Sequence, residues 1–145
     1  MEEKEKFLET NRLLELVKSS PETLGQMILS GEFSEKVSLT DYLQELMMKH
    51  NITMMEIVRI SLLSKSYVYQ IFSGERMPSR DVLLRIGLAM NCTIDEIQHL
   101  LIHAQTGSLY PKVKRDAAIL CCISQGFSLI ETNEFLEYIE ERPLL

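Results

Sequence analysis

Four polar side chains fall on one face of a short predicted helix in the middle of the chain. At about 100° per residue they project together, opposite Val68, Ile71 and Phe72, which we expect to point inward. Serine, lysine and glutamine side chains hydrogen-bond base edges and phosphates in the major groove of DNA. Any solvent-exposed helix can have such a polar face, so its interpretation as a DNA-reading face depends on the elements around it. The four residues are Lys65, Ser66, Tyr69 and Gln70.

This helix is the second of two short helices predicted between Thr53 and Pro78. Thr53 and Glu56 have the spacing of a capping box, which predicts a helix start, and Ser64 offers a second N-cap further along. Gly74 suits the C-terminal stop, where a positive φ is usual, and Pro78 prevents the helix from continuing. The stretch therefore predicts a helix, a tight turn and a second helix.

Capping residues and helical spacing predict three further helices around this pair. Ser38 precedes an apolar stripe at helical spacing, and Ser79 caps the helix that follows the motif. Thr93 with Glu96 forms another capping box. The predicted helix starts lie near residues 38, 53, 64, 79 and 93. Together they predict a compact all-α domain of five helices over residues 38–102.

An ordered series of short motifs extends from about Leu39 to Leu101. It comprises Thr53…Glu56-Ile57-Val58, Leu63-Ser64-Lys65-Ser66-Tyr67-Val68-Tyr69-Gln70-Ile71, Gly74-Glu75-Arg76-Met77-Pro78-Ser79, Leu83-Leu84-Arg85-Ile86 and Met90-Asn91-Cys92-Thr93-Ile94-Asp95-Glu96-Ile97. This series resembles the Cro/repressor-type helix-turn-helix family, also described as XRE-like or λ-repressor-like. The resemblance implies a five-helix fold whose second motif helix enters the major groove of DNA.

The resemblance also implies a sequence-specific DNA-binding transcriptional regulator of bacterial or phage type. The helix over about residues 64–73 would lie in the major groove of double-stranded DNA. Carried over by position, Lys65, Ser66 and Gln70 would read base edges, with Tyr69 beside them. Basic and hydroxyl side chains of the same region would hold phosphates. These are Thr53, Arg59, Arg76 and Arg80.

Two departures from the family pattern bear on this function. Leu62 stands where the turn usually has glycine, so it requires a strained or differently shaped backbone. Met54 stands where a polar side chain usually approaches a phosphate. With a net charge of −6, these departures favour an alternative, a protein-interaction module such as an adaptor or antirepressor without operator binding. The polar face favours DNA binding. The local charge favours it too, because residues 59–80 contain four basic residues and one acidic residue.

Helical segments flank this domain on both sides. Residues 1–37 form a predicted N-terminal extension, and residues 103–145 form a predicted helical hairpin, a candidate dimerisation or sensor region. The run over residues 117–123 is apolar on all sides, so the hairpin needs a cover. That cover is either residues 1–30 of the same chain or the same hairpin of a second subunit. We expect a homodimer, with the flanking helices also available to a protein partner.

Composition and motif content argue against several other classes. No apolar run is long enough to span a membrane, and three cysteines without framework spacing are typical of a reducing cytosol, so we expect a cytoplasmic protein. No Gly-rich phosphate loop or nucleophile elbow is present, so we expect neither catalysis nor a cofactor. His99 and His103 lie one turn apart near Cys92, but further ligands at convincing spacing are missing, so we predict no metal site. Cys121 and Cys122 are predicted core residues.

Overall fold

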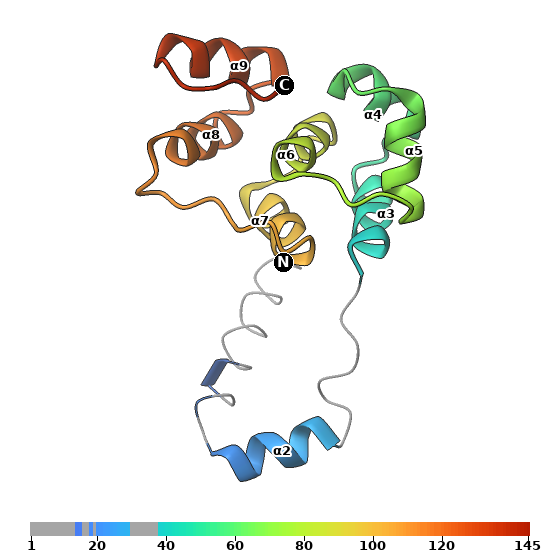
Figure 1. The fold of residues 1–145 in the computed structure, drawn as a ribbon, viewed down its shortest axis with the longest axis vertical. Helices are drawn as coiled ribbons and strands as arrows, with labels where there is room; N and C mark the ends of the chain where they lie inside the picture. The colour runs from blue at the N-terminus through green and yellow to red at the C-terminus, as the bar shows by residue number, and fades with distance from the viewer. Residues whose placement is uncertain (1–13, 16–17, 19, 30–37) are drawn as a thin grey trace. The chain divides into compact units, whose positions relative to one another are not determined.

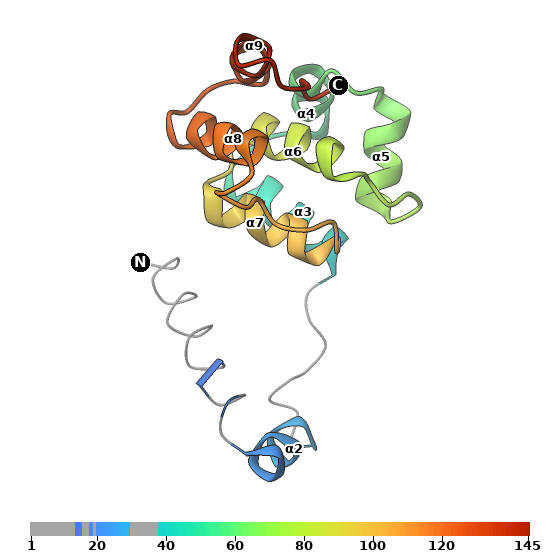
Figure 2. The ribbon, with the colours of Figure 1, turned by 60° about the vertical axis from the view of Figure 1, so that its left-hand side comes forward.

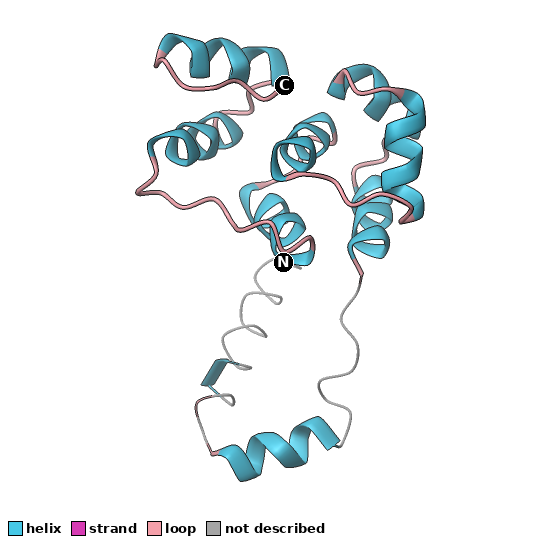
Figure 3. Cartoon of the chain, in the orientation of Figure 1, coloured by secondary structure: helices cyan, strands magenta, loops and turns pink. Residues whose placement is uncertain are grey.

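The computed structural model describes residues 14–15, 18, 20–29 and 38–145, and the regular structure in these residues is entirely helical, as predicted (Figure 3). The chain divides into two units, Met1–Lys36 and Val37–Leu145. In the first unit α2 spans Pro21–Leu29, within the N-terminal helical extension predicted over residues 1–37. Most of the rest of that predicted extension lies outside the described residues.

The described residues of the second unit form seven short helices (Figure 1). They are α3 (Leu39–Lys49), α4 (Met54–Ser61), α5 (Lys65–Ser73), α6 (Arg80–Ala89), α7 (Ile94–His103), α8 (Lys114–Ser124) and α9 (Leu129–Tyr138). The predicted five-helix domain corresponds to α3–α7, and the predicted C-terminal hairpin corresponds to α8–α9. None of the helices in the described part of the chain is long and apolar enough to cross a membrane.

Side-chain caps fix where most of these helices begin. At six starts a serine or threonine hydroxyl accepts a hydrogen bond from the backbone N–H three residues later. At α7 and α9 a glutamate also bonds back to the backbone of the cap, which completes a capping box. The six caps are Ser38, Thr53, Ser64, Ser79, Thr93 and Ser128, and the first five are the caps predicted for the five-helix domain.

Helix α6 lies at the centre of the second unit (Figures 1 and 2). It packs against α4, α7 and α9, and its residues Leu83, Leu84 and Ile86 are almost completely buried. Helix α3 packs against α5 and α7, and α5 packs against α4. Of the two motif helices, α4 is therefore held by α6 directly, and α5 is held by α4 and α3.

The C-terminal hairpin packs against the five-helix domain of its own chain, whereas the expected cover was residues 1–30 or a second subunit. Helix α9 contacts α6, helix α8 contacts α7, and Ile119 and Leu136 are fully buried. Of the apolar run over residues 117–123, Cys122 is buried as predicted. The prediction that Cys121 is a core residue is wrong, because this position of α8 faces solvent.

The hairpin repeats the plan of α6–α7 at an offset of 35 residues. Helices α7 (Ile94–His103) and α9 (Leu129–Tyr138) have bounds that differ by this offset, and α6 and α8 end 35 residues apart. The capping boxes of α7 and α9 occupy equivalent positions. The contacts between the hairpins follow the same relation. Helix α6 packs on α9, and its counterpart α8 packs on α7, the counterpart of α9. The two hairpins are therefore related by a pseudo-two-fold arrangement within one chain.

Matching amide contacts support this repeat. The side chain of Gln98 accepts from the backbone N–H of Leu109 at 2.7 Å and donates to its carbonyl at 2.9 Å. Asn133 makes the same pair of bonds to Leu144, at 2.7 and 3.1 Å. Both leucines are buried, so one amide side chain of each hairpin fixes the segment that follows it.

The turn between α4 and α5 is strained at Leu62. This residue has φ 60° and ψ 21°, in the left-handed region, and its side chain is 65% exposed. The sequence predicted a strained or altered turn here, and the strained form is observed. The guanidinium of Arg85 donates two hydrogen bonds to the carbonyl of Ser61, at 2.8 and 3.1 Å, and so holds the end of α4 in place.

Replacing Leu62 by glycine is expected to stabilise the fold. Glycine adopts a positive φ without the steric cost that a Cβ carries, although it adds entropy to the unfolded chain. Leu62→Ala is the matched control, since it removes the exposed side chain and keeps the Cβ. We expect the Gly variant to exceed the Ala variant by about 0.5–1 kcal/mol in the free energy of unfolding. Urea titration measures the difference, and equal stability would contradict the assignment of strain.

Candidate nucleic-acid interface

The polar face predicted on α5 is present and is turned to solvent. Val68, Ile71 and Phe72 anchor the helix, with exposed fractions of 0%, 1% and 4%. On the opposite side Lys65, Ser66 and Tyr69 are exposed and Gln70 is half-buried. The Nζ of Lys65 lies 5.8 Å from the ring centroid of Tyr69. The four predicted base-reading side chains therefore share one accessible surface.

An open hollow of about 370 Å³ lies on this face of α5. Its lining combines hydroxyl, amide, aromatic and guanidinium groups from α5 and from the loop that follows. It is lined by Ser64, Ser66, Tyr67, Gln70 and Arg76. Such a lining can donate to and accept from base edges and can pair with a phosphate.

Tyr67 is the member of this hollow that the sequence reasoning missed. Its ring centroid lies 5.7 Å from the guanidinium carbon of Arg76, within the range of a cation–π contact. The backbone N–H of Arg76 also donates to the carbonyl of Gln70 at 3.2 Å. These contacts fold the loop after Gly74 back onto α5 and bring Arg76 to the polar face. The helical spacing of Ser64, Tyr67 and Gln70 was the signal that could have identified Tyr67.

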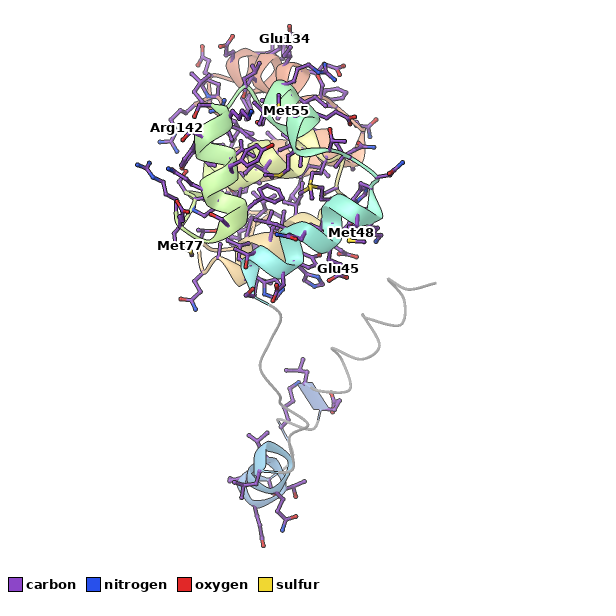
Figure 4. The ribbon with its side chains drawn as sticks, turned by 90° about the vertical axis from the view of Figure 1, so that its right-hand side faces the viewer. Glu45, Met48, Met55, Met77, Glu134 and Arg142 are labelled. Atoms are coloured by element: carbon purple, nitrogen blue, oxygen red, sulfur yellow. The ribbon has the colours of Figure 1, made fainter. Side chains whose placement is uncertain are left out.

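The other three predicted phosphate-contacting residues, Thr53, Arg59 and Arg80, have different surroundings. Thr53 is exposed, and its hydroxyl caps α4 by accepting from the backbone N–H of Glu56 at 3.2 Å. Arg59 is exposed on α4, whereas Met54 is half-buried and packs against the core. Met55 on α4 and Met77 in the loop beyond α5 are exposed apolar neighbours of the motif helices (Figure 4).

Arg80 is bound within the chain. Its Nη1 and Nη2 donate to the two carboxylate oxygens of Asp116 at 2.9 and 2.7 Å. Its Nε and Nη2 also donate to the carbonyls of Gly107 and Ser108, at 3.1 and 2.9 Å. The hydrogen bond with Asp116 raises the pKa of Arg80 more than burial lowers it. Unlike the other predicted phosphate contacts, Arg80 therefore lies at the junction with α8, where Asp116 binds its guanidinium.

One group of side chains in the described residues has metal-ligand chemistry. The ligand atoms of His50, Cys92 and Glu96 all lie within 4.8 Å of one another. The Glu96 carboxylate, however, already accepts from His50 at 2.9 Å, from Lys49 at 3.0 Å and from the Thr93 N–H at 2.9 Å. We therefore assign this group to joining α3 with α7.

His99 and His103 lie on the same side of α7, as predicted, and both approach an aromatic ring. Their ring centroids lie 6.2 and 5.0 Å from that of Tyr42 on α3. Burial, followed by the nearby charge of Glu96, raises the pKa of Tyr42 well above its usual value. These histidines therefore contribute to the packing of α3 on α7.

Comparison with known proteins identifies one match. A family model described as helix-turn-helix matches residues 43–97, which include α4, α5 and α6 in full. Neither a curated protein nor a solved structure matches the chain.

The Glu96 cluster makes a prediction about acid stability. Burial acts to raise the pKa of Glu96, but the Thr93 N–H, Lys49 and His50 outweigh it and hold the pKa below its usual 4.5. A depressed folded-state pKa gives stability that is present above the unfolded pKa and lost as pH falls through the folded one. Glu96→Gln should therefore cost about 1–3 kcal/mol at pH 7 and much less at roughly pH 3.

Glu131→Gln is the matched control for this measurement. Glu131 closes the equivalent capping box of α9, but it is exposed. Its loss should cost less at pH 7, because the capping contact it makes is exposed to water. Chemical unfolding from pH 3 to 7 compares the two variants, and identical pH profiles would refute the special role of Glu96.

Proposed function

We propose, because residues 43–97 belong to the Cro/repressor-type helix-turn-helix family, that this protein is a sequence-specific DNA-binding transcriptional regulator of bacterial or phage type. Domains of this family bind DNA in regulators and are not typically enzymes. Helix α5 would enter the major groove, as recognition helices of this motif do. The observation that carries the proposal is the solvent-facing polar surface of α5, which continues into a hollow that ends at Arg76.

The side chains of α5 and its loop divide between two roles. Lys65, Ser66, Tyr69 and Gln70 would read base edges, because amide, hydroxyl and ammonium groups match the pattern of donors and acceptors in the major groove. Arg76 would hold a phosphate while stacked on the ring of Tyr67. Of the remaining predicted phosphate contacts, Thr53 and Arg59 are exposed and would assist, whereas Arg80 is bound to Asp116 and would not contact DNA in this conformation.

The distribution of charge supports a binder that uses few phosphate contacts. The net charge of −6 would repel a polyanion over most of the surface. Residues 59–80, which include α5, carry four basic residues against Glu75. Binding would therefore depend on this one surface and weaken with rising salt.

Substitutions on α5 and in its loop should affect DNA binding differently. Gln70→Ala should cost about 1–3 kcal/mol at one operator position and leave non-specific binding nearly unchanged. Arg76→Ala should weaken binding to all sequences and reduce the salt dependence. Gel-shift titrations at several salt concentrations, with a duplex selected from random DNA, measure both effects. An equal loss on selected and random duplexes for Gln70→Ala would remove it from the base-reading set.

Homodimer formation is the second part of the proposal. A two-fold operator would place two α5 helices about 34 Å apart. Ile130 and Tyr138 on α9 are 62% and 83% exposed and offer an apolar contact on the hairpin. We expect a dimer in light scattering of the full chain and a shift toward monomer for Ile130→Asp. A monomeric wild type, or a variant that dimerises equally well, would exclude this face.

Exposed apolar side chains favour the alternative function, a protein-interaction module acting as an adaptor or antirepressor. Met48 is 80% exposed, Met55 is 53% exposed, and Leu62 at the α4–α5 turn is 65% exposed. Methionine repacks easily around different partners. Failure of the full chain to bind any selected duplex at low salt would favour this alternative over DNA binding.

A further inference from the structure

Two reciprocal ion pairs join the pseudo-two-fold-related hairpins. Arg80 of α6 pairs with Asp116 of α8 at 2.7 Å, and Arg115 of α8 pairs with Asp81 of α6 at 2.9 Å. In both pairs the guanidinium makes two hydrogen bonds to the carboxylate. An Arg-Asp dipeptide at the start of one helix thus meets the same dipeptide at the start of its counterpart.

The two arginines also make equivalent backbone contacts. Arg80 donates to the carbonyls of Gly107 and Ser108, while Arg115 donates to those of Arg142 and Pro143, each 35 residues further on. The environments differ in exposure, since the side chain of Arg80 is 25% exposed and that of Arg115 is 11% exposed. Of the two, Arg80 is the more open to an outside ligand.

Arg80 also has the closer link to the DNA-binding surface. It is the first residue of α6, and the loop before it begins at Gly74, directly after α5. Arg76 in that loop lines the hollow on α5. A phosphate that tracks along the loop from Arg76 would approach the start of α6, where the helix N-terminus adds a favourable dipole.

We propose that Asp116 competes with DNA phosphate for Arg80, so that the C-terminal hairpin limits the DNA affinity of the helix-turn-helix domain. This inference rests on the proposed function. Four N–H groups of Arg80 bind Asp116, Gly107 and Ser108, which leaves one of the five that a guanidinium carries. The Asp116 carboxylate neutralises its charge and would repel an incoming phosphate. Release of Arg80 from Asp116 supplies the interface with an additional cation.

The hairpin holds Asp116 in place independently of Arg80. The backbone N–H of Tyr110 donates to its Oδ2 at 2.9 Å, and the residue is 4% exposed. Burial acts to raise the pKa of Asp116, but Arg80, the Tyr110 N–H and Arg115 keep it below its usual value. The carboxylate therefore remains charged at neutral pH and available to compete.

The test compares Asp116→Asn with Asp81→Asn in the full chain. Both variants remove one carboxylate of the same junction, so they change net charge equally. Asp81→Asn also removes the 3.8 Å contact of Asp81 with Arg142, whose side chain is already 76% exposed. Asp116→Asn frees the more exposed Arg80, whereas Asp81→Asn frees the more buried Arg115. We expect the slope of log affinity against log salt, on random duplex DNA, to steepen by about 0.9 for Asp116→Asn only.

Arg80→Gln in two backgrounds provides the second measurement. In the wild-type background it should leave the slope nearly unchanged, because Arg80 is occupied. In the Asp116→Asn background it should remove the gain. An unchanged slope for Asp116→Asn, an equal gain for Asp81→Asn, or a slope lowered by about 0.9 for Arg80→Gln alone would each overturn the competition.

The outcomes separate this inference from the proposed function. A wild type that binds no duplex at low salt would refute the proposed function and the inference together. A wild type that binds normally, with a slope insensitive to Asp116, would refute the inference alone. Thermal unfolding of each variant establishes that it is folded at the assay temperature. If Asp116→Asn is unfolded, the salt slope of the Arg80→Gln single variant tests the competition instead.

Discussion

Short helix length is the physical constraint that shapes residues 38–145. The seven helices α3–α9 have between 8 and 11 residues, which is too few for stability in isolation. Each must bury its apolar side against others, and α6 does so against α4, α7 and α9. A buried residue such as Leu84 or Ile86 therefore supports several helices at once.

The central place of α6 connects the polar face of α5 with the C-terminal hairpin. One side of α6 packs on α4, the first helix of the motif, and another packs on α9. Its first two residues, Arg80 and Asp81, form the ion pairs with α8. A change in the hairpin can therefore reach the loop that carries Arg76 through one rigid helix. This arrangement gives a helical extension a physical route to influence the proposed DNA-binding surface on α5.

Polar side chains at the helix junctions have hydrogen-bond or ion-pair partners. No buried side-chain nitrogen or oxygen in the described residues lacks a hydrogen-bond partner. Glu96 bonds to residues from α3 and from its own cap, and Arg115 bonds to Asp81 and to backbone carbonyls. Because a buried charge that loses its partner is costly, these contacts fix how the helices meet. Leu62 is an exception of another kind, a local strain at the turn of the motif.

The sequence by itself determined where helices begin and which side of α5 is buried, because both depend on residues within one or two turns. A cap such as Ser64 needs only the N–H of Tyr67, and Val68 and Ile71 follow the 100° period. Only the tertiary structure decided the role of Arg80, the Glu96 cluster and the repeat of α6–α7. Arg80 meets Asp116 across 36 positions and His50 meets Glu96 across 46. Such pairs form only when helices distant in the sequence pack together, and the spacing of residues within one helix does not specify that packing.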